Sequence, residues 1–246
     1  MIPILMYHQI GQPAPKGTPF RGLTVHPTDF RRQMKWLRRF GYRGLSMRDL
    51  TPYLNGSRQG KVVGITFDDG YRNVFKYALP ILQEYGFTST NYFVARQMDG
   101  SNVWDHDLGV PSSPLMSVAE MQVWHESGQE VGSHTLDHVH LTRVSPEVAL
   151  YQIKQSKKEL EDMINADVTA FCYPYGDESS TIRDMVKEAG YLNATTTERG
   201  LVRANDDIFG LPRSTVARST NIVRFLQRCL TRLEDNKRLK KEQANA

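Results

Sequence analysis

Short apolar runs alternate with amphipathic segments along most of this 246-residue chain, and this order constrains the fold more than any other feature. Apolar runs bounded by turn residues predict strands, and apolar residues spaced three and four apart predict helices. A chain that repeats strand and helix in this way forms a mainly parallel sheet with right-handed crossovers. The predicted strands span residues 2–7, 61–67, 88–94, 130–133 and 168–173, and the predicted helices span residues 29–40, 74–85, 118–127, 146–164 and 180–189.

The pattern predicts an α/β fold but leaves the closure of its sheet open. A closed or distorted barrel and an open, doubly wound sheet both fit the order of elements, and the length suits one domain of either kind. Residues 99–116 lack periodicity and contain two glycines and two prolines. A loop of this length in a compact domain is often functional, so we expect it to influence the choice of substrate.

The net charge of +4 arises in the C-terminal tail. Residues 218–246 contain eight basic and three acidic residues, so residues 1–217 carry a charge of −1. This balance excludes a basic groove for nucleic acid in the body of the chain. No apolar run reaches the ~20 residues needed to span a bilayer. The first residues do not form a signal peptide, and we therefore expect a cytoplasmic location.

Two adjacent carboxylates, Asp68 and Asp69, directly follow the predicted strand 61–67. At the end of a strand both side chains can turn into one site. Like charges this close are costly unless a cation or a shared proton relieves them. A metal ion on one carboxylate would leave the other free to act as a base. The alternative is a solvated Asp-Asp-Gly turn.

Three of the seven histidines, His134, His138 and His140, lie within seven residues after the predicted strand 130–133. The spacing of four between His134 and His138 can place two imidazoles on one cation. Two imidazoles and one carboxylate, with open positions left, suit Zn²⁺, although Fe²⁺ and other divalent ions also use this set. The alternative is that these are surface or capping histidines.

A rigid turn at residues 173–176 follows a further predicted strand. Such a turn can present a backbone N–H, for instance that of Tyr175, to a developing oxyanion; an ordinary strand-to-helix turn is the alternative. His8 ends the first strand, and Arg213 follows a short strand late in the chain. In a parallel barrel the carboxyl ends of the strands share one face, where active sites assemble. We therefore expect these residues to meet the acidic and histidine motifs there.

From Pro3 to about Val216 the chain resembles the polysaccharide deacetylases, the NodB-homology domains of carbohydrate esterase family 4. The first motif of that family stands here as Thr-Phe-Asp-Asp-Gly at 66–70, and the second as His-Thr-Leu-Asp-His at 134–138. The segments at 5–8, 173–176 and 211–213 are similar to the branch that contains poly-N-acetylglucosamine deacetylases. The resemblance implies a distorted (β/α) barrel of the seven-stranded NodB type, similar to a TIM barrel.

The resemblance also implies an activity, namely metal-dependent removal of N-acetyl groups from an N-acetylhexosamine-containing glycan or glycolipid, with release of acetate. It makes Asp69, His134 and His138 the metal ligands and Asp68 the general base. Zn²⁺ is the metal expected first, and Fe²⁺, Co²⁺, Ni²⁺ and Mn²⁺ are the others. Hydrolysis of another C–N bond, in a cyclic amide or ureide, remains an alternative, as does a non-catalytic carbohydrate-binding module.

The chain departs from the family pattern in two places. Many members carry an arginine in the third motif, where Cys172 stands here, so we expect Arg213 to hold Asp68 in place. Many members also take a general-acid histidine from a late motif, but this chain has no histidine after His140. We therefore expect His8 to serve as the acid, with His106 in reserve. The residues expected to contact the substrate are Tyr173, Pro174, Trp104 and His106.

The expected domains are a catalytic domain at residues 1–217 and a basic amphipathic helix with a tail at residues 218–246. The helix begins at Asn221, and its arginines recur every four residues, at 224, 228 and 232. We expect it to dock on the barrel with a solvated basic face. Peripheral contact with an anionic membrane is the alternative. The sequence does not determine the oligomeric state.

Overall fold

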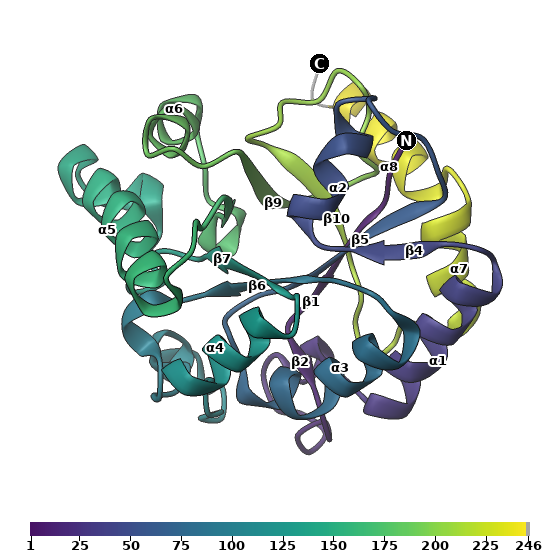
Figure 1. The fold of residues 1–246 in the computed structure, drawn as a ribbon, viewed down its shortest axis with the longest axis horizontal. Helices are drawn as coiled ribbons and strands as arrows, with labels where there is room; N and C mark the ends of the chain where they lie inside the picture. The colour runs from purple at the N-terminus through teal and green to yellow at the C-terminus, as the bar shows by residue number, and fades with distance from the viewer. Residues whose placement is uncertain (245–246) are drawn as a thin grey trace.

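Seven parallel strands close into a barrel in the computed structural model, which describes residues 1–244 (Figure 1). Around the barrel the strands pair in the order β1-β10-β9-β8-β7-β6-β5, and β5 pairs back with β1. This closure confirms the predicted distorted barrel and excludes the open sheet. The strands are β1 (Ile4–Tyr7), β5 (Val62–Phe67), β6 (Thr90–Phe93), β7 (Glu130–Ser133), β8 (Ala170–Cys172), β9 (Asn193–Arg199) and β10 (Leu211–Thr215).

The barrel is distorted where β5 meets three neighbours. The short strand β4 (Arg43–Leu45) pairs with the first half of β5, and β6 takes over the same edge from Thr66 onward. A second, two-stranded sheet joins β2 (Gln9–Ile10) to β3 (Thr24–Val25). The sequence did not predict these three strands, because two or three residues are too few to display a period of two.

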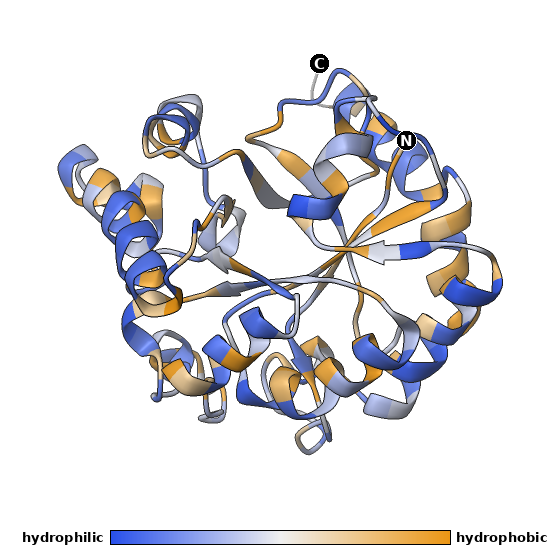
Figure 2. Cartoon of the chain, viewed as in Figure 1, coloured by the Kyte–Doolittle hydropathy of each residue, from blue (hydrophilic) through white to orange (hydrophobic). Residues whose placement is uncertain are grey.

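Helices surround the barrel and bury their apolar faces against it. For example, α1 buries Phe30, Met34 and Leu37, which recur at helical spacing. Figure 2 shows hydrophobic and hydrophilic residues alternating along these helices. The helices are α1 (Pro27–Arg39), α2 (Met47–Leu54), α3 (Arg72–Tyr85), α4 (Val118–Glu126), α5 (Pro146–Ile164), α6 (Ser180–Glu188), α7 (Ile222–Leu230) and α8 (Leu233–Ala244).

The C-terminal segment forms two helices, where the sequence predicted one. The chain is extended at Thr231, so α7 ends there and α8 begins in a new direction. Phe225 and Cys229 anchor α7 in the core, and ion pairs dock α8, among them one of 2.7 Å between Arg203 and Asp235. Residues 245 and 246 of the predicted tail lie outside the described residues. Within residues 1–244, no helix has the length and apolarity required to cross a bilayer.

Gly132 is required by close packing inside the barrel. A Cβ atom at this position of β7 would lie 2.5 Å from Cδ1 of Tyr92. Tyr92 is fully buried, and Cζ of Arg213 lies over its ring, 5.7 Å from the ring centroid. The ring therefore has no free space into which it could move.

We expect Gly132→Ala to lower the free energy of unfolding by about 1–3 kcal/mol, the usual cost of overpacking a core. Urea denaturation followed by circular dichroism measures this change. Gly22→Ala is the matched control, since a Cβ there meets nothing within 4 Å. Equal stability of the two variants would show that the barrel interior is not packed as described.

Candidate active site

The adjacent carboxylates lie at the carboxyl end of β5 and line one cavity. The N–H of Asp68 donates to the carbonyl of Tyr7 at 3.0 Å, which continues the pairing of β5 with β1. Asp69 then adopts a φ of 75°, in the left-handed region that non-glycine residues rarely occupy. This turn lets two consecutive side chains enter the same cavity, although consecutive residues of a strand point to opposite faces.

Asp69, His134 and His138 form a compact triad of potential metal ligands. The Nε2 atoms of His134 and His138 lie 3.5 Å and 3.4 Å from Oδ1 of Asp69. One ligand atom from each residue lies within 4.8 Å of the others, and all three side chains are buried. Two ligands of a tetrahedral Zn²⁺ at about 2.0–2.1 Å are themselves roughly 3.4 Å apart, so the donor set fits a divalent ion.

The hydrogen bonds of the triad direct its ligand atoms toward one another. Nδ1 of His134 lies 2.7 Å from the carbonyl oxygen of Cys172, which can only accept, so Nδ1 carries a hydrogen and Nε2 is the atom that faces Asp69. Burial opposes the charged form of His134, but Cys172 and Asp69 raise the pKa of this imidazole well above its ordinary value, so a divalent ion would take the place of the proton on Nε2. Burial lowers the pKa of His138, which favours its neutral form. Burial opposes the charge of Asp69, but the two imidazoles hold the pKa of this carboxyl well below its ordinary value.

A buried arginine holds the second carboxylate. Arg213 donates from Nη1 and Nη2 to the two oxygens of Asp68, at 2.6 Å and 2.7 Å. Burial alone would raise the pKa of Asp68, but the Arg213 guanidinium keeps it below its ordinary value. The prediction that Arg213 follows a strand was wrong. It lies inside β10 with its side chain in the barrel interior, where it contacts Asp68 and does not line the cavity.

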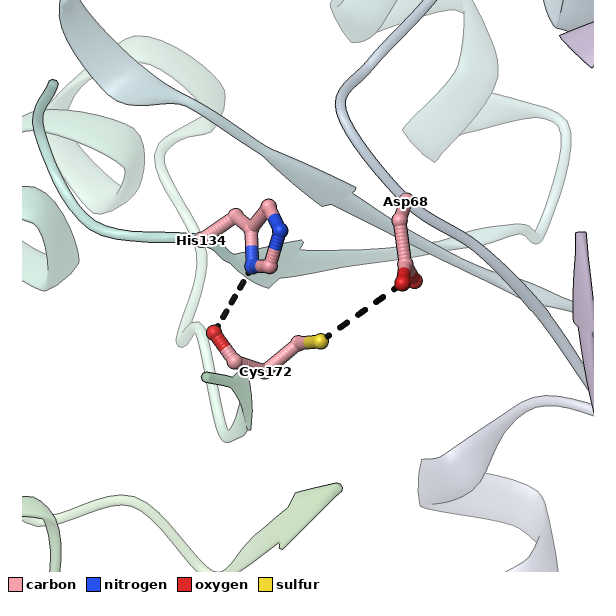
Figure 3. Close-up of side chains that lie close together, drawn as sticks. All are labelled: Asp68, His134 and Cys172. Carbon is pink, nitrogen blue, oxygen red and sulfur yellow. Dashed lines mark hydrogen bonds between the residues drawn. The ribbon is translucent and has the colours of Figure 1, made fainter. Parts of the chain in front are cut away.

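Cys172 connects Asp68 to His134, one of the potential metal ligands (Figure 3). Its thiol lies 3.8 Å from Oδ2 of Asp68 and accepts a hydrogen bond of 3.1 Å from Nη2 of Arg213, while its carbonyl accepts from His134. One residue at the end of β8 therefore contacts both the carboxylate and a candidate ligand. Many family members carry an arginine at this position. Here the guanidinium comes from Arg213 instead, and Cys172 lies beside it.

The cavity has a volume of about 110 Å³ and opens at the carboxyl ends of the strands. The predicted residues that line it are His8, Asp68, Asp69, Trp104, His134, His138, Tyr173 and Tyr175. His8 is placed with its Nδ1 buried and without a hydrogen-bond partner among the described residues. A buried polar atom without a partner is uncommon in a folded protein and marks His8 for attention.

Aromatic rings confine the histidine ligands. Trp104 stacks on His138 with ring centroids 4.5 Å apart, and Tyr175 packs edge-on against the same imidazole, also at 4.5 Å. Tyr175 stacks in turn on His140 at 3.9 Å. Tyr175 and His138 both have a positive φ, near 60°. Strained backbone of this kind collects at functional sites, where the surrounding structure holds it.

Two residues expected to contact the substrate do not line the cavity. His106 is exposed on the 3₁₀ helix Val103–Leu108, and Pro174 is buried beneath the turn. A 3₁₀ helix turns every three residues, so Trp104 and Asp105 face the cavity and His106 faces solvent. The loop at 99–116, expected to be functional, therefore contributes a different pair of side chains from the one predicted.

Six further residues that line the cavity were not predicted from the sequence, and Asp105 is the most important of them for the chemistry of the site. Asp105 is 6% exposed, and burial together with the charge of Asp69 raises its pKa to about 6. Nothing in the sequence distinguishes it from Asp107 two residues later, because only the turn of the helix decides which one enters the cavity. The six residues are Gln9, Phe20, Leu23, Tyr71, Asp105 and Thr197.

Comparison with known proteins places the chain among carbohydrate-modifying enzymes. The sequence profile described as Polysaccharide deacetylase matches residues 55–194, more than half of the chain. The protein YxkH of Bacillus subtilis is 28% identical over 218 residues, which cover 88% of this chain and 71% of that protein. The poly-β-1,6-N-acetyl-D-glucosamine N-deacetylase of Escherichia coli K12 is 23% identical over 244 residues, 86% of this chain but only 36% of the relative.

A solved structure of a deacetylase has a similar fold. The Streptococcus pyogenes deacetylase PplD, in complex with acetate, superposes with a TM-score of 0.81 and 27% identity, over 93% of this chain and 97% of that one. A similarity of this extent shows that the two chains share the fold of the barrel.

We expect the purified protein to bind one equivalent of Zn²⁺. We expect Asp69→Asn to weaken that binding at least about 100-fold, because loss of a residue that only contacts a metal ligand already costs about 10- to 100-fold in affinity. Isothermal titration calorimetry against a competing chelator measures the affinity. His140→Ala is the matched control, because His140 lies in the same loop but pairs with Asp177 instead of Asp69. Equal losses in both variants would remove the triad as the metal site.

Proposed function

The chain belongs to the polysaccharide deacetylase family, and from this premise we propose that it is a divalent-metal-dependent hydrolase that removes the N-acetyl group from an N-acetylhexosamine unit of a glycan or glycolipid. The observation that supports the proposal is that the buried carboxylate of Asp68 lines one cavity with Asp69, His134 and His138, which could hold a metal ion. An acetamide carbon held in that cavity lies within reach of both.

Asp69, His134 and His138 would hold the metal ion. When bound, a divalent ion supplies a Lewis acid that polarises the acetamide carbonyl and lowers the pKa of water. The residues around it act without further rearrangement, since the tautomer of His134 is already set by the carbonyl of Cys172. Such outer contacts orient ligands and are a regular part of metal sites.

Asp68 acts as the general base. It is buried, charged and held by two hydrogen bonds from Arg213, so its orientation is settled before substrate binds. It accepts the proton of the attacking water. The backbone N–H of Tyr175 stabilises the negative charge that develops on the acetamide oxygen.

His8 acts as the general acid that protonates the departing amine. An amine is a poor leaving group unless it receives a proton as the C–N bond breaks. His8 lines the same cavity as Asp68, Asp69 and Asp105. The exposed His106 is not used, because it does not reach the cavity.

We expect Asp68→Asn to retain Zn²⁺ and to lose at least about 100-fold in kcat for acetate release, the lower range for loss of a general base. A coupled acetate assay, with metal content measured on the same sample, checks both parts. Asp107→Asn is the matched control, since it makes the same change at an exposed carboxylate that does not line the cavity. Near-normal turnover in Asp68→Asn would refute this role.

We expect His8→Ala to lose far more activity on an amide than on an activated ester. Hydrolysis of an N-acetylglucosamine oligomer should fall at least about 100-fold, while hydrolysis of 4-nitrophenyl acetate should fall less than about 10-fold, because an aryl oxide leaves without a proton. Rates with both substrates are compared at one pH. Equal losses on the two substrates would contradict the role as acid.

The substrate class is tested by acetate release from N-acetylglucosamine oligomers, a lipid-linked N-acetyl sugar and peptidoglycan, with stoichiometric metal. Release from any of them, abolished in Asp68→Asn, supports the proposal. Sugar binding without acetate release would instead identify a carbohydrate-binding module. Hydrolysis only of cyclic amides or ureides would identify the other C–N hydrolase.

A further inference from the structure

A second depression lies on the outer wall of the barrel, where α7 and α8 meet the end of β9. This outer-wall groove has a volume of about 320 Å³ and shares no lining residue with the catalytic cavity. The side chains that line it are Arg199, Arg224, Gln227, Arg228, Leu233, Glu234 and Lys237.

Cations outnumber acids in the outer-wall groove by four to one. Glu234 is fully buried and pairs with Arg199, whose Nη2 lies 2.9 Å from its carboxylate, and with Arg228, whose Nε lies 3.4 Å away. Among the described residues, neither Arg224 nor Lys237 has an acidic group within ion-pair distance. The groove therefore carries a net charge of +3 over a small, concave surface.

Docking of α8 does not account for this excess. A single arginine neutralises Glu234, and α8 is also held by separate pairs, such as Arg238 with Asp206 at 2.8 Å. Burial, together with the repulsion of Arg199 and Arg224, lowers the pKa of Arg228 despite the opposing effect of Glu234. Concentrated positive charge that lacks enough acidic partners is the electrostatic complement of an anion.

Exposed apolar side chains flank the outer-wall groove. Val223, Gln227 and Leu230 are spaced by four and three residues and so form one stripe along α7. Gln227 lines the groove, while Val223 is 61% exposed and Leu230 is 37% exposed. A basic surface combined with exposed aliphatic residues on a helix is the pattern of a peripheral membrane contact.

We propose that the outer-wall groove binds the phosphate of an anionic phospholipid headgroup, with Val223 and Leu230 entering the interfacial layer of the membrane. Arg224 and Lys237 contact the phosphate, since both are free to do so. Arg199 and Arg228 remain engaged with Glu234 and add to the positive field. The binding is independent of the deacetylase activity, because it uses none of the residues assigned to the catalytic cavity.

The test measures co-sedimentation of the full chain with vesicles of phosphatidylcholine containing 30% phosphatidylglycerol. Arg224→Gln combined with Lys237→Gln removes the two unpaired cations and should weaken binding about 10- to 30-fold, since each basic residue near an anionic surface contributes roughly fivefold. The matched control, Lys154→Gln with Lys158→Gln, removes the same charge from exposed positions on α5, which lies across the barrel from α7 (Figure 1). It should bind like the unmodified chain.

Three further measurements complete the test. Pure phosphatidylcholine vesicles should not bind, binding should fall as NaCl is raised, and both double variants should keep the melting temperature of the unmodified chain. Equal binding by groove and control variants would overturn the proposal. Tight binding of soluble glycerol phosphate without any sedimentation with vesicles would also overturn it, because the anion would then be a free phosphate.

Discussion

The buried ion pair between Arg213 and Asp68 is the interaction on which the rest of the site depends. Removing two charges from water is expensive, and the expense is offset only when geometry and further hydrogen bonds are good. Here both carboxylate oxygens accept from one guanidinium, which also donates to Thr66 and to the carbonyl of Thr196. The pair connects β10 to the end of β5 across the intervening β1, so it fixes Asp68 only once β1 has paired with both strands.

The ion pair explains how Asp68 is held in place although the third motif of this chain contains no arginine. Arg213 reaches Asp68 from β10, and Cys172, small and buried, occupies the space at the end of β8. The carbonyl of the same cysteine orients His134. The proposed base Asp68 and the proposed ligand His134 therefore share a supporting residue, and a change at Cys172 would affect both.

The catalytic cavity and the outer-wall groove carry opposite excesses of charge. In the cavity, two adjacent carboxylates need cations. The Arg213 guanidinium pairs with Asp68, and the proposed divalent ion would pair with Asp69. In the outer-wall groove, four cations surround one carboxylate, and the proposed phosphate would balance the excess positive charge. The two sites come within two residues of each other on β9, where Thr197 lines the cavity and Arg199 lines the groove.

The sequence alone determined the strands β1, β5, β6, β7 and β8, the helices α1, α3, α4, α5 and α6, the parallel pairing, and the positions of Asp68, Asp69, His134 and His138 at strand ends, because these depend on local periodicity and spacing. It did not reveal β9, whose asparagine, threonine, glutamate and arginine side chains form no apolar run. Only the tertiary structure decided that the sheet closes, that Arg213 lies inside a strand, and which side chains of the 103–108 turn enter the cavity. These features depend on contacts between residues far apart in the chain. No local pattern encodes them, since a strand or a 3₁₀ turn has the same sequence signature whichever way its neighbours direct it.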